Sequence, residues 1–166
     1  MTPYQAIYCG GDRLKYNRRM LGFGLIALLI CTIAVYSIYQ NLTYEFKFES
    51  GELREELTSP DGDYTAQVFL QLYGGAAGGV NVYVNVIFHS EGHIVRAVYY
   101  SDAKSYLHVN WVDRDRLSIT NTGGGENRSI VLTVGKEIYD ETGRACRAYS
   151  IQKNYTCYSK KNSIPS

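Results

Sequence analysis

The sequence contains no internal repeat and no excess of charge of either sign. The turn string SPDG, which opens each blade of many secreted propellers, occurs once, at residues 59–62. A propeller is excluded because 166 residues do not hold several blades of about 40 residues each. The formal net charge of +1 argues against a general nucleic-acid binder, since neutralising phosphates needs a concentrated basic surface. We therefore expect one folded domain that does not bind nucleic acid.

Linear motifs of catalysis are also missing. The chain has no G-x-S-x-G, no G-x-G-x-x-G after a predicted strand, no P-loop and no C-x-x-C. The glycine-rich stretches GGAAGG (74–79) and TGGGEN (122–127) lack the following helix on which a phosphate-binding glycine loop depends. The sequence therefore predicts no catalytic residue and no cofactor.

The string HSEGH, residues 89–93, contains side chains of the types that bind zinc. In the zinc-protease pattern the glutamate directly follows the first histidine on a helix, whereas here Glu91 is displaced and Gly92 breaks the helix. The acids of DRDR, residues 113–116, alternate with arginines and lack the closing glutamate of a calcium loop. We interpret both strings as polar turns and expect no metal site.

Charged residues are absent from residues 20–39, MLGFGLIALLICTIAVYSIY. At about 1.5 Å rise per residue, a helix of this length spans roughly 30 Å, the thickness of a bilayer core. Residues 45–63 carry seven acidic residues against two basic ones, whereas the segment before residue 20 has a single acid, Asp12, against Arg13, Lys15, Arg18 and Arg19. Because basic flanks stay in the cytoplasm, we expect a single-pass cell-membrane protein with its N-terminus inside and its C-terminal domain outside.

Two alternatives to a transmembrane helix are a cleaved signal peptide and the core helix of a soluble domain. Tyr36 stands where a cleavage site needs a small residue, and Ile30 stands where a lipoprotein signal needs one before Cys31. A core helix would show a polar stripe at helical spacing, and this segment is apolar all round. The transmembrane helix is therefore the favoured interpretation.

The remainder of the chain is typical of β structure, since 16 tyrosines suit strands and 16 glycines suit turns. Alternating aromatic and charged residues predict a strand over 44–48, followed by a polar connection over 49–58 with at most one helical turn. A tight turn is then predicted at Ser59, Pro60, Asp61 and Gly62, where proline presets φ and glycine accepts positive φ.

Residues 64–72 and 80–88 each alternate apolar and polar residues on either side of GGAAGG, which predicts an antiparallel hairpin. Further strands are predicted over 93–100, 106–112 and 130–134 and from Leu117, with TGGGEN as a loop. We expect Trp111 to pack in the core against Leu70, Val82 and Val84. The predicted fold is mainly β: a single antiparallel meander or sandwich-like domain after one transmembrane helix.

A family resemblance rests on the order S-P-D-G-x-Y-x-A, a glycine-rich gap, V-Y-Y, W-x-D-x-D-x-L-x-I and V-G-K-E-I-Y-D over residues 59–140. Together with the preceding apolar helix, this order resembles a group of small, uncharacterised single-pass membrane proteins of Gram-positive bacteria. The chain departs from that pattern in its cysteine-containing tail after Asp140. The resemblance implies an anchor and an external β domain, and it brings no known activity.

Cys146 and Cys157 are the two cysteines that follow the apolar segment, and an oxidising compartment permits them to pair. The alternatives are a disulfide and two unpaired thiols. We expect the disulfide, formed across a short hairpin whose turn is near Lys153. Closing such a loop stabilises a fold by about 3 kcal/mol.

The domain organisation and the function follow from these patterns. The tail after residue 141 has five basic residues and no acid, so it can fold onto the acidic juxtamembrane segment, contact anionic polymers or remain solvated. We expect a cytoplasmic segment (1–19), a transmembrane helix (20–39), a juxtamembrane strand and linker (40–58), an extracytoplasmic β domain (59–140) and a basic tail (141–166). The predicted role is non-enzymatic binding or scaffolding at the cell envelope, with the lipid bilayer and an unknown envelope protein or polymer as partners. An envelope enzyme with a non-linear site and an immunity protein are the alternatives.

Overall fold

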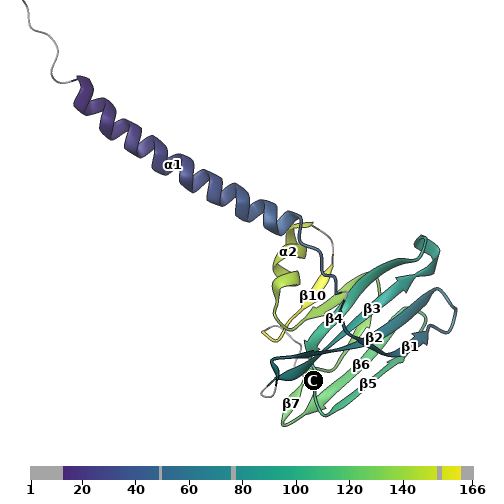
Figure 1. Cartoon of the computed structure of the whole chain (residues 1–166). Coiled ribbons are helices and arrows are strands. Elements are labelled where there is room, and N and C mark those ends of the chain that lie inside the picture. Colours follow the sequence, from purple (N-terminus) through teal and green to yellow (C-terminus); the bar gives the residue numbers. More distant parts are fainter. Residues whose placement is uncertain (1–12, 49, 76–77, 153–154, 162–166) are drawn as a thin grey trace, which may run out of the picture. The chain divides into compact units, whose positions relative to one another are not determined.

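The computed structural model describes residues 13–48, 50–75, 78–152 and 155–161 (Figure 1). The chain divides into two compact units, Met1–Gln40 and Asn41–Ser166. Helix α1 (Arg13–Leu42) contains the predicted residues 20–39, and its stretch Met20–Leu42 has a mean hydropathy of 2.4. Within the described residues this is the one helix long and apolar enough to cross a membrane, and none of that apolar stretch is buried.

The second unit contains a six-stranded sheet, sheet A, with the strand order β1-β2-β3-β4-β9-β10. Its first four strands form antiparallel hairpins: β1 (Glu52–Thr58), β2 (Tyr64–Tyr73), β3 (Gly79–Phe88) and β4 (Ile94–Asp102). The hairpin of β2 and β3 was predicted from the alternation in residues 64–88. The last two strands, β9 (Glu137–Asp140) and β10 (Thr156–Tyr158), pair in parallel, which the sequence did not predict.

A second sheet, sheet B, has four strands: β5 (Tyr106–Trp111), β6 (Arg116–Gly123), β7 (Glu126–Asn127) and β8 (Ile130–Thr133). TGGGEN, predicted as a loop, is instead the end of a hairpin, because Thr122 pairs with Asn127 and Gly123 with Glu126. The turn residues Gly124 and Gly125 both have positive φ, which a two-residue turn between twisted strands requires.

The two sheets pack against each other through one apolar cluster (Figure 1). Its buried members come from both sheets: Ala66, Val68, Val82, Val84, Val86, Phe88, Val98, Tyr99, Val109, Leu117, Ile119, Leu132, Val134 and Tyr139. The predicted sandwich-like, mainly β domain after one apolar helix is therefore confirmed, with mixed rather than purely antiparallel pairing in sheet A.

The strand predicted over residues 44–48 is wrong, because these residues pair with no other strand. The segment 49–58, predicted as a polar connection, instead contains strand β1, which pairs with β2. The alternation itself is real, because Phe46 is buried and Tyr44 and Phe48 pack beside it in a second apolar cluster. The Phe48 ring lies 4.6 Å from that of Tyr100 and 5.1 Å from that of Tyr83. This segment therefore covers the outer face of sheet A through its side chains and is not a strand of the sheet.

The hairpin predicted between the two distal cysteines is wrong, because a helix, α2 (Arg144–Gln152), occupies most of that segment. Ala145, Ala148 and Tyr149 recur at helical spacing and are buried in the second cluster, which favours the helix over a strand. The predicted turn near Lys153 lies outside the described residues. The disulfide itself is present and joins Cys146 of α2 to Cys157 of β10, with 5.1 Å between their Cα atoms.

Candidate binding surfaces

The predicted turn residues connect β1 to β2. Ser59 is almost fully buried, its hydroxyl donates to Asp61 at 2.7 Å, and the same hydroxyl accepts from the Tyr64 amide at 3.1 Å. The hydrogen bond from Ser59 lowers the pKa of the Asp61 carboxyl, and Gly62 takes a φ of 80°. Pro60 precedes these residues in the turn. The polar side chains of this turn therefore form hydrogen bonds within the turn and stabilise its conformation.

The predicted core residues fall into two groups. Val82 and Val84 are fully buried, whereas Leu70 and Trp111 are partly buried against the same cluster. The Trp111 indole N–H donates to the Leu57 carbonyl at 2.9 Å, so the ring joins sheet B to the edge strand β1 of sheet A.

The histidines do not gather into a site. His89 and His93 lie at the β3–β4 turn with ring centroids 5.0 Å apart, and the His89 Nε2 atom lies 2.9 Å from the Thr65 hydroxyl. His108 is on β5, in the other sheet. Among the described residues, no three His, Cys, Asp or Glu side chains come together in a way that would hold a metal ion.

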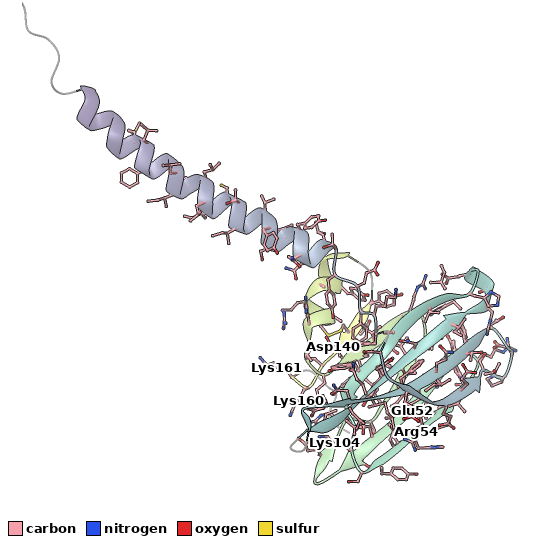
Figure 2. All side chains as sticks on the ribbon, in the orientation of Figure 1. Glu52, Arg54, Lys104, Asp140, Lys160 and Lys161 are labelled. Atoms are coloured by element: carbon pink, nitrogen blue, oxygen red, sulfur yellow. A yellow bond between two sulfur atoms is a disulfide. The ribbon has the colours of Figure 1, made fainter. Side chains whose placement is uncertain are left out.

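The edges of sheet A differ in length and charge. The edge strand β1 exposes Glu52 and Arg54, which Figure 2 labels, together with Glu56. Charged side chains on an edge oppose pairing with a further strand. The opposite edge, β10, has only three residues. Neither edge offers a long apolar ladder to a partner.

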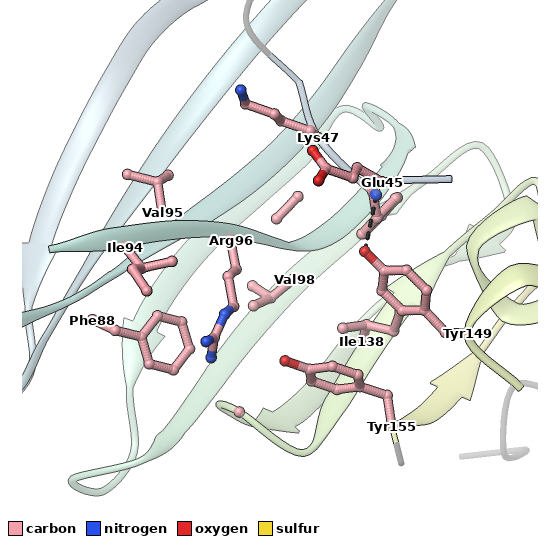
Figure 3. Close-up of a pocket in the computed structure, with 13 residues that line it drawn as sticks. Glu45, Lys47, Phe88, Ile94, Val95, Arg96, Val98, Ile138, Tyr149 and Tyr155 are labelled. Carbon is pink, nitrogen blue, oxygen red and sulfur yellow. Dashed lines mark hydrogen bonds between the residues drawn. The ribbon is translucent and has the colours of Figure 1, made fainter. Parts of the chain in front are cut away.

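A small cavity of about 180 Å³ lies where β4 and β9 diverge (Figure 3). The two strands pair at Tyr99 and Tyr100 alone, so among the described residues the first half of β4 has no neighbouring strand on that side. Apolar side chains and two tyrosines line most of the cavity: Phe46, Phe88, Ile94, Val95, Ala97, Val98, Ile138, Tyr149 and Tyr155. This volume is below the roughly 300 Å³ at which small-molecule sites begin.

The one arginine of this cavity already has partners. The Arg96 guanidinium lies 4.5 Å from the centre of the Phe88 ring, and its Nη2 atom lies 2.6 Å from the Glu91 carboxylate. The Tyr149 hydroxyl accepts a hydrogen bond from the Phe46 amide at 2.9 Å, drawn as a dashed line in Figure 3. The cavity therefore suits an apolar side chain of a partner better than a charged metabolite.

A network of ionic side chains lies on or directly after β4, β7 and β9, on another side of the domain. Arg128, of which 9% is exposed, donates from Nε to Glu141 at 2.9 Å and from Nη2 to Glu126 at 2.9 Å. The Lys104 ammonium contacts both Glu126 and Asp102. The hydrogen bond from Lys104 is the main reason why the pKa of Glu126 falls to about 2. Both glutamates are therefore ionised and held by cations at neutral pH.

A fully buried asparagine supports this network from inside. The Asn121 amide donates to the Tyr99 hydroxyl at 2.9 Å and to the Asp102 carbonyl at 3.0 Å, and its oxygen accepts from the Lys104 amide at 2.8 Å. The ring of Tyr139 stacks on that of Tyr99 at 5.0 Å, and burial raises the pKa of Tyr139 to about 12. Within the described residues the Tyr139 hydroxyl has no hydrogen-bond partner.

A second, more open cavity of about 530 Å³ lies beside this network, between α2 and the end of β10. It is lined by Glu141, Thr142, Gly143, Cys146, Arg147, Ser159, Lys160 and Lys161. Figure 2 labels Lys160 and Lys161, which follow β10. The cavity thus combines three cations, two hydroxyl groups and one carboxylate.

Sequence analysis did not single out Arg128, Glu126, Glu141 or Asn121. The ion pairs join strands that are far apart in the sequence, so no local spacing connects them. One local signal was available: Asn121 continues the inward positions of Leu117 and Ile119, and an amide on a core-facing position needs buried partners. The basic tail, for which three outcomes were open, contacts Glu126 and Glu141 through Lys160.

A protein-family model, described as a family of unknown function (DUF5412), matches residues 17–144. The match includes most of α1 and the strands from β1 to β9, whereas both cysteines of the disulfide lie beyond it. No curated protein and no solved structure matches the chain significantly. The expected membership of an uncharacterised family is therefore confirmed, and the Gram-positive source remains a prediction.

Proposed function

The chain belongs to this family of unknown function, and we propose that it is a single-pass protein of the cell membrane whose extracytoplasmic β domain binds a component of the cell envelope. The proposal includes no catalytic activity. The observation that carries it is the charge difference across α1. The basic residues precede the apolar stretch Met20–Leu42, and the acidic residues follow it.

The distal disulfide supports the same location independently. Cys146 and Cys157 are bridged in the part of the chain that follows the apolar stretch. Disulfides persist in oxidising compartments and are rare in the cytoplasm, so a β domain outside the cytoplasm would keep this bridge.

A binding role is favoured over an enzymatic one by the shapes of the two cavities. The cavity at the divergence of β4 and β9 is too small for most substrates, and its arginine is neutralised by Glu91. The cavity beside α2 is larger and open, with charged side chains at its rim. Open charged surfaces suit recognition of a large partner, whereas many enzymes enclose the reacting groups of their substrates.

The topology is tested with two complementary reporters, one active only in the cytoplasm and one active only outside it. The cytoplasmic reporter should be active when fused before Gly10 and inactive when fused after Ser166, and the external reporter should give the opposite pattern. Alkylation of intact cells without reduction should leave Cys146 and Cys157 unlabelled. A cytoplasmic C-terminus, or stoichiometric labelling of both thiols, would contradict the proposal.

A further inference from the structure

We propose that the cavity between α2 and the end of β10 is a binding site for the phosphate groups of an anionic envelope polymer or lipid. This inference rests on the proposed function for the place where the ligand is met, while the chemistry of the site stands on its own. Its cations are Arg147 on α2 and Lys160 and Lys161 after β10. We call this cavity the basic cavity.

The charge of the basic cavity is the first argument. Three cations line it against one carboxylate, Glu141, which gives 3 − 1 = +2 at neutral pH. Lys160 lies 3.7 Å from Glu126 and 3.9 Å from Glu141, beyond hydrogen-bond length, and its side chain is 57% exposed. Lys160 therefore contacts a ligand in the cavity without leaving a buried ion pair.

The one carboxylate of the cavity, that of Glu141, is hydrogen-bonded to buried groups of the domain. One oxygen of Glu141 accepts from Arg128 at 2.9 Å, and the other accepts from the Ser101 hydroxyl at 2.7 Å and the Asp102 amide at 2.9 Å. Because Arg128 is almost fully buried beside it, the negative charge of Glu141 is compensated within the protein. Lys160 and Lys161 are exposed at the rim of the cavity.

The neighbouring acid, Asp140, also has hydrogen-bond partners within the protein. It is 1% exposed, and its carboxylate accepts from the Thr142 amide and hydroxyl and, at 2.7 Å, from the Ala145 amide near the start of α2. The N-terminus of α2 is thus capped by a side chain of the protein. The proposed site depends on side-chain cations, not on the helix dipole.

The disulfide holds the two walls of the basic cavity together. Arg147 follows Cys146 directly, and Ser159 to Lys161 begin two residues after Cys157. The walls also approach each other at Gly143, where a Cβ atom would lie 3.6 Å from the Ser159 Cβ and 3.8 Å from Arg147 Nη1. The distance between the cations therefore depends on the bridge, and reducing the bridge should weaken ligand binding.

The chemical class of the ligand follows from these donors. Guanidinium and ammonium groups from two elements line the cavity, and a phosphate offers them more acceptor oxygens than a carboxylate does. A polymer of phosphodiesters or a phospholipid headgroup presents such an anion. A nucleic acid needs a basic surface along its length, which a chain with 17 basic and 16 acidic residues lacks.

The test uses the full chain in nanodiscs of phosphatidylcholine and a short poly(glycerol phosphate) as probe, with binding measured by calorimetry. We expect saturable binding that inorganic phosphate displaces and that weakens between about 0.05 M and about 0.5 M NaCl because salt screens exposed charges. The double variant Lys160→Gln with Lys161→Gln should weaken binding roughly tenfold, and Arg147→Gln should weaken it roughly threefold. Reduction of the wild-type chain should also weaken binding.

The control is a double variant with the same change in charge elsewhere, Arg54→Gln with Lys136→Gln, which alters exposed residues of β1 and of the β8–β9 turn. It should bind the probe as the wild type does. Nanodiscs that contain phosphatidylglycerol distinguish the two sources: competition with the polymer indicates that a headgroup also fills the cavity, and its absence assigns the site to the polymer.

The proposal is overturned if the control loses as much affinity as the cavity variants, or if the wild type binds neither probe. Because the purified chain is used, this outcome is independent of the topology measured in cells. A cytoplasmic β domain that bound phosphate would contradict the proposed location and leave the site in place.

Discussion

The side-chain amide of Asn121 donates a hydrogen bond to the hydroxyl of Tyr99 at 2.9 Å, although both residues are completely buried between the sheets. The Tyr99 hydroxyl in turn donates to the Arg128 carbonyl at 3.0 Å. A buried polar group is tolerated only when it is paired, so this pair fixes the position of β6 against β4.

Replacement of Asn121 by alanine should destabilise the domain by about 3 kcal/mol. The change leaves the Lys104 amide and the Asp102 carbonyl without their side-chain partner, and each unpaired buried group costs about 1 to 3 kcal/mol. Urea unfolding of the wild type and the variant measures the difference. The matched control is Asn110→Ala, an exposed asparagine on β5, which should change stability by less than about 0.5 kcal/mol. Equal effects of the two changes would disprove the role of the buried amide.

Replacement of Trp111 by alanine should destabilise the domain by about 3 kcal/mol, the lower end of the range for a large aromatic residue, because its ring is only partly buried. Trp111→Phe keeps most of the packing but loses the hydrogen bond to Leu57, so it should cost about 1 kcal/mol. Thermal unfolding compares both with Tyr106→Ala, a change of an aromatic residue on the same strand whose side chain is 60% exposed. If Trp111→Ala left the melting temperature unchanged, the predicted packing of Trp111 against the core would be wrong.

Glu141 should make the stability of the domain depend on pH in the acidic range. Burial acts to raise the pKa of its carboxyl, but hydrogen bonds from Ser101, Asp102 and Arg128 together hold this pKa below the usual value. Because the folded pKa is the lower one, the stabilisation is complete above the unfolded pKa of about 4.3 and is lost as the pH falls through the folded pKa.

Urea midpoints measured between about pH 7 and about pH 2 test this dependence. Glu141→Gln should be less stable than the wild type at neutral pH and should lose less stability on acidification. Glu52→Gln, a change on the exposed edge strand β1, should follow the wild-type profile. If Glu141→Gln also followed it, the carboxylate would not be the group responsible.

The parts of the fold that sequence analysis predicted are those in which one face of a strand is apolar. The β2–β3 hairpin is such a case, since Ala66 and Val68 pair with Val86 and Val84 on the core side. Strand β1 escaped prediction because Glu52 to Thr58 lies at an edge and exposes most of its side chains, so no alternation marks it. Helix α2 was missed because its tyrosine and isoleucine also suit a strand, and the burial that selects the helix comes from sheet A.

The candidate site was predictable only in its covalent part. The even pair of distal cysteines predicted the bridge, and the basic tail indicated the sign of the charge. The positions of Arg147 and Lys160 around one cavity depend on α2 and on the parallel pairing of β9 with β10, which no local pattern specifies.

The parallel strands at the end of sheet A lead us to expect a particular order of folding. Strands β1 to β4 follow one another in the sequence and are joined by short loops. Tyr99 of β4, in contrast, pairs with Tyr139, and all strands of sheet B lie between these two residues in the sequence. Contacts between distant residues form slowly because a long loop must first be closed. We therefore expect the hairpins to form first, and β9, β10 and the disulfide to complete the sheet last. Until then, Tyr99 and Tyr100 of β4 lack the strand that they pair with in the folded domain and could pair with another chain.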